Sequence, residues 1–311
     1  MPPQLSVISP VFKAEHCIDE LHRRLTDVLR SMNVDYEIIL VEDGSPDGSA
    51  RVVERIAAND ARVTSLILSR NFGQHAAILA GLAESRGEAI VVIDCDLQDD
   101  PQDIPKLYAK IGEGYDVVIA QRTTRKDSLF KRATARLWLA VLNLLSDVSI
   151  EPGTGGFSAI TRQVASELLR MPNRHVHYRL VLGWLGFRQT VVPVEHGTRF
   201  HGRSSYSLGS LIAHALSGFV FHSKRLLYFS VYAGFAFVLL SAVQFAYVIV
   251  LKVRHDVGVA GWASLMAAIW LVGGAILFSL GVIGAYLARV VDDVQERPSF
   301  VVRRRVRAES V

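Results

Sequence analysis

The sequence predicts an α/β fold with a mostly parallel sheet, followed by a membrane-associated region. Three observations support this prediction. Between Gln4 and Arg122, strand-like segments alternate with segments of helical periodicity. The strand-like segments are almost continuously apolar, which is typical of parallel strands that helices cover on both faces. Two stretches near the end of the chain carry no charged residue and exceed the roughly 20 residues that span a bilayer.

The first part of the chain is expected to contain five strands and four helices in alternation. The first helix has the clearest periodicity, because apolar residues from Ile18 to Leu29 recur on one face. The first strand is expected to end at Pro10, and the fourth helix to begin after Pro105. The strands are expected within residues 4–12, 36–45, 63–69, 89–96 and 115–122, and the helices within residues 16–32, 46–59, 73–86 and 99–114.

Polar residues collect at the carboxyl ends of the expected strands. In open sheets of this kind, ligands bind beyond these ends. A binding site is therefore expected at this edge of the sheet. The residues concerned are Pro10, Glu42, Asp43, Arg70, Asn71, Asp94, Cys95, Asp96, Gln121 and Arg122.

Four aspartates, Asp94, Asp96, Asp99 and Asp100, directly follow a buried apolar segment. Carboxylates this close repel one another, which predicts a positive group among them. The glycine-rich phosphate-binding motifs are missing from the sequence. A divalent cation on Asp94 and Asp96 is the alternative, because such cations use one or two carboxylates together with substrate phosphates. Two aspartates separated by one residue also occur at ordinary strand ends. Their place here, directly after a buried strand, favours a metal site. Asp99 and Asp100 precede a proline and are interpreted as the cap or start of the next helix.

Composition places the chain at a membrane. Of its residues 50% are hydrophobic and the mean hydropathy is +0.27, which is too apolar for an ordinary soluble enzyme. The excess lies in two runs, Leu226–Leu251 and Val257–Ala288. These predict two membrane spans, and two buried core helices are the alternative. The net charge of +4 suits an anionic membrane face. It does not suggest nucleic acid, because no basic run is interleaved with aromatic residues.

Charges beside the two runs predict the orientation of the membrane region. Basic residues precede the first run at Lys224 and Arg225 and follow the second at Arg289 and residues 303–307. The loop between the runs is short. By the positive-inside rule, both termini and the soluble part then lie in the cytoplasm. No signal peptide is visible, and two cysteines without metal spacing indicate a reducing compartment.

Several short motifs follow one another in a recognisable order: "SPVF", "VEDGSPDGS", "LSRNFGQHAAILAGL", "DCDLQDDP", "AQR", "RFHGRSSYS" and "ERPSF". Over essentially the whole chain, this order resembles the polyprenyl-phosphate glycosyltransferases. These are family-2 glycosyltransferases with a GT-A fold, and they include dolichol-phosphate mannose synthases and bacterial undecaprenyl-phosphate glycosyltransferases. The resemblance implies transfer of a monosaccharide from a nucleotide-sugar to polyprenyl phosphate, with Mg²⁺ or Mn²⁺ as the cofactor and inversion at the anomeric carbon.

The resemblance also implies roles for individual residues. It places Asp94, Asp96, Arg122 and Arg199 in the catalytic machinery, and Asp94, Asp96 and Gln98 on the metal. The residues implied for the nucleotide-sugar site are Pro10, Glu15, Asp43, Asp94, Cys95 and Asp96. Those implied for the acceptor phosphate are Arg122, Arg199 and Ser204, with Arg199, Gly202 and Ser204 in a loop that closes over the site. The helical spacing of Lys131, Arg132 and Arg136 predicts that these cations also face lipid phosphate.

Three of these residues have simpler explanations. Asp43 is also explained as a turn acid, Gln98 as a helix-start residue, and Arg199 as a solvated loop charge. The chain also departs from the family pattern, because "GTGGFSAI" has Gly156 and Ser158 where many bacterial relatives have G-D-F-R. The lost carboxylate makes a base at this position doubtful. The departure is interpreted as a sign of a different sugar, for example an amino- or deoxysugar.

The expected organisation has four parts. Residues 1–205 form the cytoplasmic catalytic domain, 206–225 an interfacial helix, 226–288 the two membrane spans and 289–311 a cytoplasmic tail. A further basic and apolar segment, residues 126–147, is also expected to lie in the bilayer interface. Ordinary core helices are the alternative for both interfacial segments. Small residues in the spans favour a homo-oligomer, and the product is expected to pass to a flippase.

Two other functions compete with the transferase. "DCDLQ" superficially resembles the opening of haloacid-dehalogenase-type phosphatases, in which the first aspartate is a nucleophile. A membrane-anchored phosphohydrolase is disfavoured, because no lysine and acid set follows downstream. A non-catalytic scaffold that binds nucleotide is favoured only by Gly156. Transfer of a sugar to lipid phosphate would separate the three functions.

Overall fold

The computed structural model describes residues 2–122, 154–171, 178–194, 261–295 and 297–308, with single positions between 232 and 250. The chain divides into two compact units. The first comprises Met1–Asn143, Val148–Tyr206 and Arg297–Val311, and the second comprises Leu144–Asp147 and Ser207–Glu296. The candidate site belongs to the first unit.

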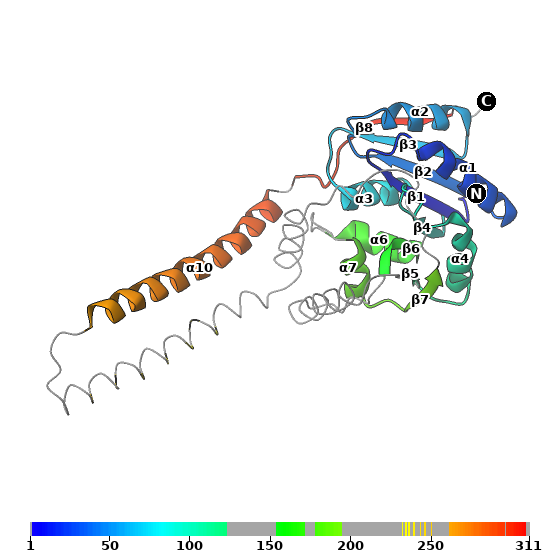
Figure 1. The fold of residues 1–311 in the computed structure, drawn as a ribbon. Helices are drawn as coiled ribbons and strands as arrows, with labels where there is room; N and C mark the ends of the chain where they lie inside the picture. Colours follow the sequence, from blue (N-terminus) through cyan, green and yellow to red (C-terminus); the bar gives the residue numbers. More distant parts are fainter. Residues whose placement is uncertain are drawn as a thin grey trace. The chain divides into compact units, whose positions relative to one another are not determined.

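The described part of the first unit is built on an eight-stranded sheet with the order β7-β5-β6-β4-β1-β2-β3-β8 (Figure 1). Strands β1, β2, β3 and β4 are parallel to one another, as are β5 and β7, whereas β6 and β8 run antiparallel to their neighbours. The predicted mostly parallel α/β sheet is therefore confirmed. The strands are β1 (Leu5–Val11), β2 (Tyr36–Glu42), β3 (Val63–Leu68), β4 (Ala89–Val92), β5 (Val117–Arg122), β6 (Thr154–Thr161), β7 (Gln189–Val194) and β8 (Val302–Arg307).

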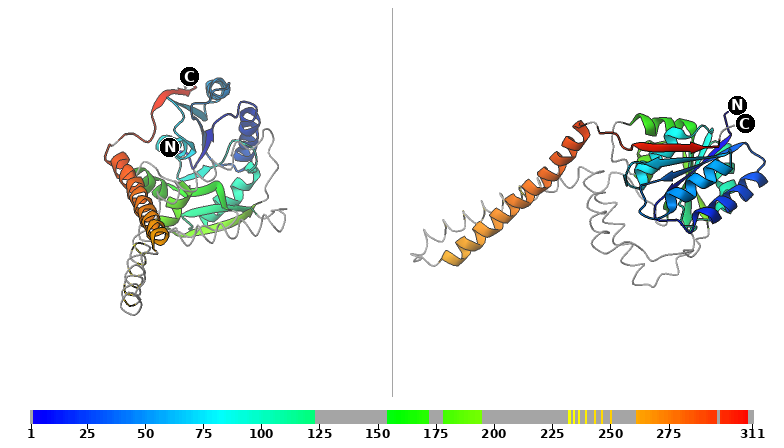
Figure 2. Two further views of the ribbon diagram at one scale, coloured as in Figure 1. Left: turned by 60° about the vertical axis from the view of Figure 1, so that its left-hand side comes forward. Right: turned by 90° about the horizontal axis from the view of Figure 1, so that it is seen from above.

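Helices cover both faces of this sheet (Figure 2). Leu21 of α1, Val53 of α2 and Leu107 of α4 belong to the core cluster of one face. Leu79 of α3 and Val164 of α6 belong to the cluster of the other face, together with α7. The helices are α1 (Ile18–Ser31), α2 (Ser49–Asn59), α3 (Gln74–Glu84), α4 (Ile104–Gly112), α6 (Arg162–Arg170) and α7 (Tyr178–Trp184), with a 3₁₀ turn η1 (Pro101–Asp103) before α4.

The prediction that β1 ends at Pro10 is wrong by one residue. Pro10 is paired with Val41 of β2, and the strand continues to Val11. On its other side, the pairing of β1 with β4 reaches only Ile8. A proline donates no hydrogen bond, and it is tolerated here because one side of the strand is already unpaired at this point.

The segments around the aspartates also differ from their predicted bounds. β4 ends at Val92 rather than at Asp96, so the aspartates lie in the loop after the strand. Helix α4 begins at Ile104, with Pro105 inside its first turn, where a missing N–H costs nothing. The Asp100 side chain accepts the N–H of Gln102 and caps η1, which confirms the predicted helix-capping role of Asp100.

Strand β8 was not predicted, because its sequence "VRRRVR" contains four arginines. It pairs antiparallel with β3 and covers what would otherwise be the edge of the sheet. Arg304 forms an ion pair with Glu54 of α2 at 3.2 Å, and Arg305 forms one with Glu84 of α3. The arginines therefore bind acidic residues of the helices on either face.

The second unit contains α10 (Trp262–Val294). Within this helix, the stretch Leu271–Ala288 is long and apolar enough to cross a membrane, and only 6% of it is buried. It falls inside the second predicted span. Most of the first predicted span, Leu226–Leu251, lies outside the described residues, so the two-span topology stays a prediction.

Candidate active site

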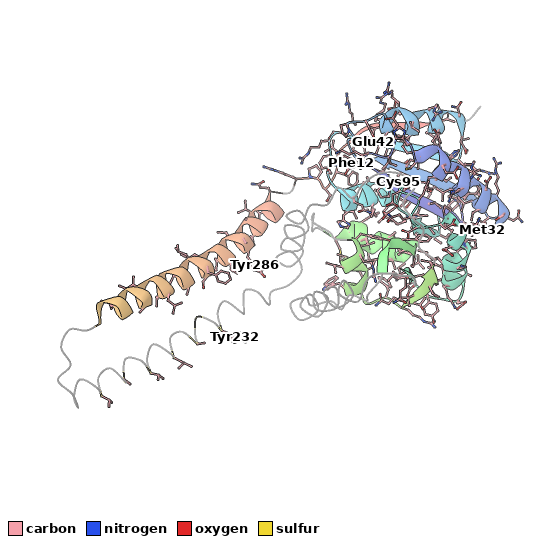
Figure 3. All side chains as sticks on the ribbon, viewed as in Figure 1. Phe12, Met32, Glu42, Cys95, Tyr232 and Tyr286 are labelled. Carbon is pink, nitrogen blue, oxygen red and sulfur yellow. The ribbon has the colours of Figure 1, made fainter. Side chains whose placement is uncertain are left out.

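The loops that follow β1, β2 and β4 meet at one edge of the sheet. At the ends of β1 and β2, Val11 is paired with Glu42, and β4 lies on the other side of β1. Figure 3 shows Phe12, Glu42 and Cys95 gathered at this edge, whereas Met32 lies at the opposite end. The predicted grouping of site residues at the carboxyl edge thus follows from the parallel pairing.

Asp94 and Asp96 lie in the loop that follows β4. Both side chains are partly exposed, and Cys95 between them is buried. The side-chain amide of Gln74 donates to Oδ1 of Asp94 at 2.7 Å. The backbone N–H of Gln98 donates to Oδ1 of Asp96 at 3.1 Å. The spacing of the two aspartates therefore presents two carboxylates at the edge, each with one oxygen held by an N–H group.

The loop after β4 contains an unusual backbone conformation at Leu97. Its φ is 59°, in the left-handed region that a leucine rarely enters. The Leu97 side chain is 6% exposed and packs in the core, which helps to hold the residue in this conformation. A strained backbone conformation persists only where the surrounding structure holds it. Such residues are often found at ligand-binding sites. Sequence reasoning missed Leu97, since nothing in "DCDLQ" signals a positive φ.

Asp43 fastens the segment before α3 to the end of β2. Its Oδ1 accepts the N–H of Phe72 at 2.7 Å, and its Oδ2 accepts the N–H of Gly73 at 2.9 Å. The residue is 2% exposed. Burial raises the pKa of the Asp43 carboxyl above its ordinary value, against the lowering effect of these two donors. These contacts make Asp43 a structural anchor of the edge, and its predicted contact with the nucleoside stays a prediction.

Glu15 joins the loop after β1 to the loop after β2. Its Oε2 accepts the N–H of Gly48 at 2.9 Å. A Cβ at Gly48 would lie 2.2 Å from Oε1 of Glu15, so the close approach depends on glycine. Nearby, the Ser49 hydroxyl accepts the N–H of Ala14 at 3.1 Å. The small polar residues of "EDGSPDGS" thus tie the two loops together.

Cys95 lies at this edge with its side chain buried in the hydrophobic core. Burial raises the pKa of its thiol to about 12. The pKa of the Cys17 thiol, at the start of α1, is also raised, first by burial and then by the charge of Asp96. Both thiols are therefore protonated at neutral pH. The predicted contact of Cys95 with the nucleotide-sugar stays a prediction. Because the thiol is buried, such a contact would have to involve the backbone of Cys95.

Gly156 lies in β6 beside Asp94. A Cβ at this position would lie 3.5 Å from Oδ1 and 3.7 Å from Oδ2 of Asp94, and 3.8 Å from Nε2 of Gln74. Ser158 is fully buried, and its hydroxyl shares a hydrogen bond with the Tyr178 hydroxyl at 3.0 Å. Of the two residues that differ from the family pattern, Gly156 therefore lies next to Asp94. Ser158 is instead hydrogen-bonded inside the core.

Most of the predicted acceptor residues lie outside the described part of the chain. Arg122 is the last residue of β5, and its side chain is not among those described. The other predicted residues outside the described ranges are Lys131, Arg132, Arg136, Arg199, Gly202 and Ser204.

The aspartates fit a divalent cation that shares its ligands with a substrate. Among the described residues, no group of three or more histidine, cysteine, aspartate or glutamate side chains could hold a metal by itself. Asp94 and Asp96 are partly exposed oxygen donors. Mg²⁺ characteristically binds one or two carboxylates and completes its shell with phosphates and water. The donor set therefore suits a metal bound together with a diphosphate.

Comparison with known proteins identifies the family. Residues 6–169 match the model of glycosyl transferase family 2. A relative from Bacillus subtilis (strain 168), the uncharacterized glycosyltransferase YkcC, is 36% identical over 97% of this chain and 94% of its own length. The likeness therefore extends well beyond the matched domain, to almost the whole of both chains.

Two further relatives carry more specific names. The undecaprenyl-phosphate 4-deoxy-4-formamido-L-arabinose transferase of Pseudomonas fluorescens (strain SBW25) is 33% identical over 97% of this chain and 90% of its own. The prophage bactoprenol glucosyl transferase homolog of Escherichia coli (strain K12) is 30% identical over 97% of this chain and 99% of its own. The two names differ in the sugar and agree in naming a polyprenyl lipid.

Proposed function

The chain belongs to glycosyl transferase family 2 and is a glycosyltransferase, and we propose that it transfers a monosaccharide from a nucleotide-sugar to polyprenyl phosphate. The observation that carries this proposal is the pair Asp94 and Asp96 at the carboxyl edge of the sheet, where three loops meet. The lipid acceptor is supported by the names of two relatives that match almost the whole chain.

In this proposal Asp94 and Asp96 hold Mg²⁺ or Mn²⁺. When bound, the cation would neutralise the negative charge that the leaving nucleoside diphosphate gains as the glycosidic bond breaks. The loops tied together by Glu15 and Asp43 surround this place and bind the nucleoside. Pro10 lies at the same edge and belongs to the donor site in this proposal. Gln98, two residues after Asp96, is proposed to hold the metal together with the two aspartates.

The acceptor needs no dedicated base in this proposal. A phosphate monoester has a second pKa of roughly 6, so it is mostly dianionic and nucleophilic at neutral pH. The enzyme's contribution is to bind and orient the phosphate with cations. We assign this role to Arg122 and Arg199, with Lys131, Arg132 and Arg136 toward the lipid. Gly156 in place of an acid is compatible with this chemistry.

The reaction is proposed to take place at the cytoplasmic face of the membrane. The membrane unit, residues 207–296, is inserted between β7 and β8 of the same sheet. Because the sheet lies on one side of a membrane, the inserted segment must cross it an even number of times. With α10 as one span, this parity supports a second span within Leu226–Leu251.

The experiment that tests the function uses the purified full chain in detergent with undecaprenyl phosphate and Mg²⁺. A panel of nucleotide-sugars is added, and glycolipid products are measured by mass spectrometry. We expect a product with one donor class, which also names the sugar. Nucleotide binding without product from any donor would contradict the transferase and favour the scaffold.

We propose that Gly156 contributes to the choice of the donor sugar. Gly156→Asp is expected to change donor preference in the same panel, because its carboxylate would lie beside Asp94. Gly156→Ala is the matched control, because its Cβ meets Asp94 and Gln74 only at ordinary contact distances of 3.5–3.8 Å. An unchanged donor preference in Gly156→Asp, at wild-type protein yield, would contradict this part of the proposal.

A further inference from the structure

Gln74 is the first residue of α3, and its side chain contacts Asp94. The amide Nε2 donates to Oδ1 of Asp94 at 2.7 Å, although the two residues are 20 positions apart in sequence. Gln74 is exposed, so burial of its side chain does not account for its place. The bond connects the helix after β3 to the loop after β4.

The start of α3 is held firmly, so Gln74 reaches Asp94 from a fixed point. Asp43 accepts both backbone N–H groups that directly precede the helix. Gly73, the residue before Gln74, has φ 96°, a conformation that glycine adopts readily. Farther along the helix, Gly81 packs so closely on β1 that a Cβ would lie 2.4 Å from Cγ2 of Ile8. The helix is thus bonded to Asp43 at its start and packed closely on β1 near its end.

We propose that Gln74 is a positioning residue, which holds the Asp94 carboxylate in one orientation for a divalent cation. This inference rests on the proposed function, because it takes Asp94 as a metal ligand. Hydrogen bonds to ligating carboxylates are a general means of fixing their orientation and tuning metal affinity. The bond from Gln74 fixes the position of Oδ1 of Asp94 and, with it, the plane of the carboxylate.

An amide suits this role better than a charged donor. It donates a hydrogen bond without a formal charge, so Asp94 keeps its negative charge for the cation. A lysine or arginine in the same place would form a stronger, charge-assisted bond and offset that charge. The amide therefore orients the ligand at little cost to its affinity for the cation.

Gly156 lies beside this contact. A Cβ at position 156 would lie within 3.5–3.8 Å of both Asp94 and Gln74. With glycine there, position 156 leaves room around the bond between Gln74 and Asp94.

The test measures Mn²⁺ binding to the purified full chain by electron paramagnetic resonance, with Mn²⁺ as the probe and a mixture of the common nucleoside diphosphates present to complete its ligands. Gln74→Met keeps the length and helix preference of the side chain and removes the donor. It is expected to raise the dissociation constant for Mn²⁺ at least about tenfold, the low end for hydrogen-bond partners of metal ligands. Gln163→Met, at the exposed second position of α6, is the matched control and should bind as wild type.

A second measurement separates positioning from a general structural role. In Gln74→Met, the Mn²⁺ concentration for half-maximal transfer should rise by the same factor, while the rate at saturating Mn²⁺ should stay near wild type. A merely structural role would lower the melting temperature and leave the Mn²⁺ affinity unchanged.

The outcomes distinguish this inference from the proposed function. Wild-type Mn²⁺ affinity in Gln74→Met, together with lost binding in Asp94→Asn, would overturn the role of Gln74 alone. Equal binding in wild type, Gln74→Met and Asp94→Asn would overturn the metal site itself, and the inference with it.

Discussion

At the scale of residues, burial separates two kinds of group at the carboxyl edge. Asp43 and Cys95 are buried, and their contacts are with the protein itself. Asp94 and Asp96 are partly exposed and each has an oxygen held by an N–H group. A buried carboxylate is costly unless it is fully hydrogen-bonded, whereas a cation can reach a partly exposed pair. This difference in exposure supports the proposal that Asp94 and Asp96 bind the ligand while Asp43 anchors the edge.

The buried thiols give a prediction that depends on pH. Because the thiolate is the reactive form and the pKa of Cys95 is about 12, the folded protein should resist alkylation by iodoacetamide at pH 8. The same chain in denaturant should be alkylated at Cys17 and Cys95, as intact mass would show. The protonated form is favoured in the fold, so this contribution to stability is full below the ordinary pKa of 9.0 and is lost as pH rises toward 12. Rapid alkylation of the folded chain would contradict the burial of Cys95.

At the scale of elements, the site depends on how closely α3 packs on the sheet. Gly81 faces β1 and β2, and a Cβ there would lie 2.4 Å from Cγ2 of Ile8 and 3.3 Å from Cγ2 of Val41. Both are branched side chains of neighbouring central strands. The helix that carries Gln74 is thus held at a distance that only glycine allows.

Gly81→Ala should therefore destabilise the first unit. We expect the free energy of unfolding to fall by about 1–3 kcal/mol, the usual cost of overpacking a core, as measured by urea titration. Gly112→Ala, at the end of α4, is the control, because no atom lies within 4 Å of a Cβ there. That variant should be unchanged or more stable by less than about 1 kcal/mol. Equal stability of the two variants would refute the tight packing of α3.

The alternating first half of the fold was predictable from sequence, because apolar strands and amphipathic helices leave clear periodic patterns. β6 and β8 were not, for physical reasons. β6 has two glycines directly after its first residue, and β8 is mostly arginine, with Arg304 and Arg305 paired to Glu54 and Glu84 of distant segments. The aspartates of the site were predictable from their place after a strand. The contact of Gln74 with Asp94 was not, because it joins the start of α3 to the loop after β4, which only the sheet brings together.

At the scale of the whole molecule, the chain leaves the first unit after β7 and returns to it as β8. The returning strand pairs with β3 along five register positions, from Thr64 with Arg307 to Leu68 with Val302. The segment between them contains the candidate membrane helix. In sequence, the candidate membrane helix therefore lies between two strands of the sheet that carries the site.

The central claim is that the aspartates after β4 act in sugar transfer through a cation. The most direct test compares glycolipid formation by Asp96→Asn and Asp100→Asn in the full chain, with undecaprenyl phosphate, Mg²⁺ and the preferred donor. Asp100 caps η1, a role that asparagine also performs, so this control should keep its activity. We predict that Asp96→Asn loses transfer by at least about 100-fold while its unfolding transition stays that of the wild type. Near-normal transfer by Asp96→Asn would contradict the account.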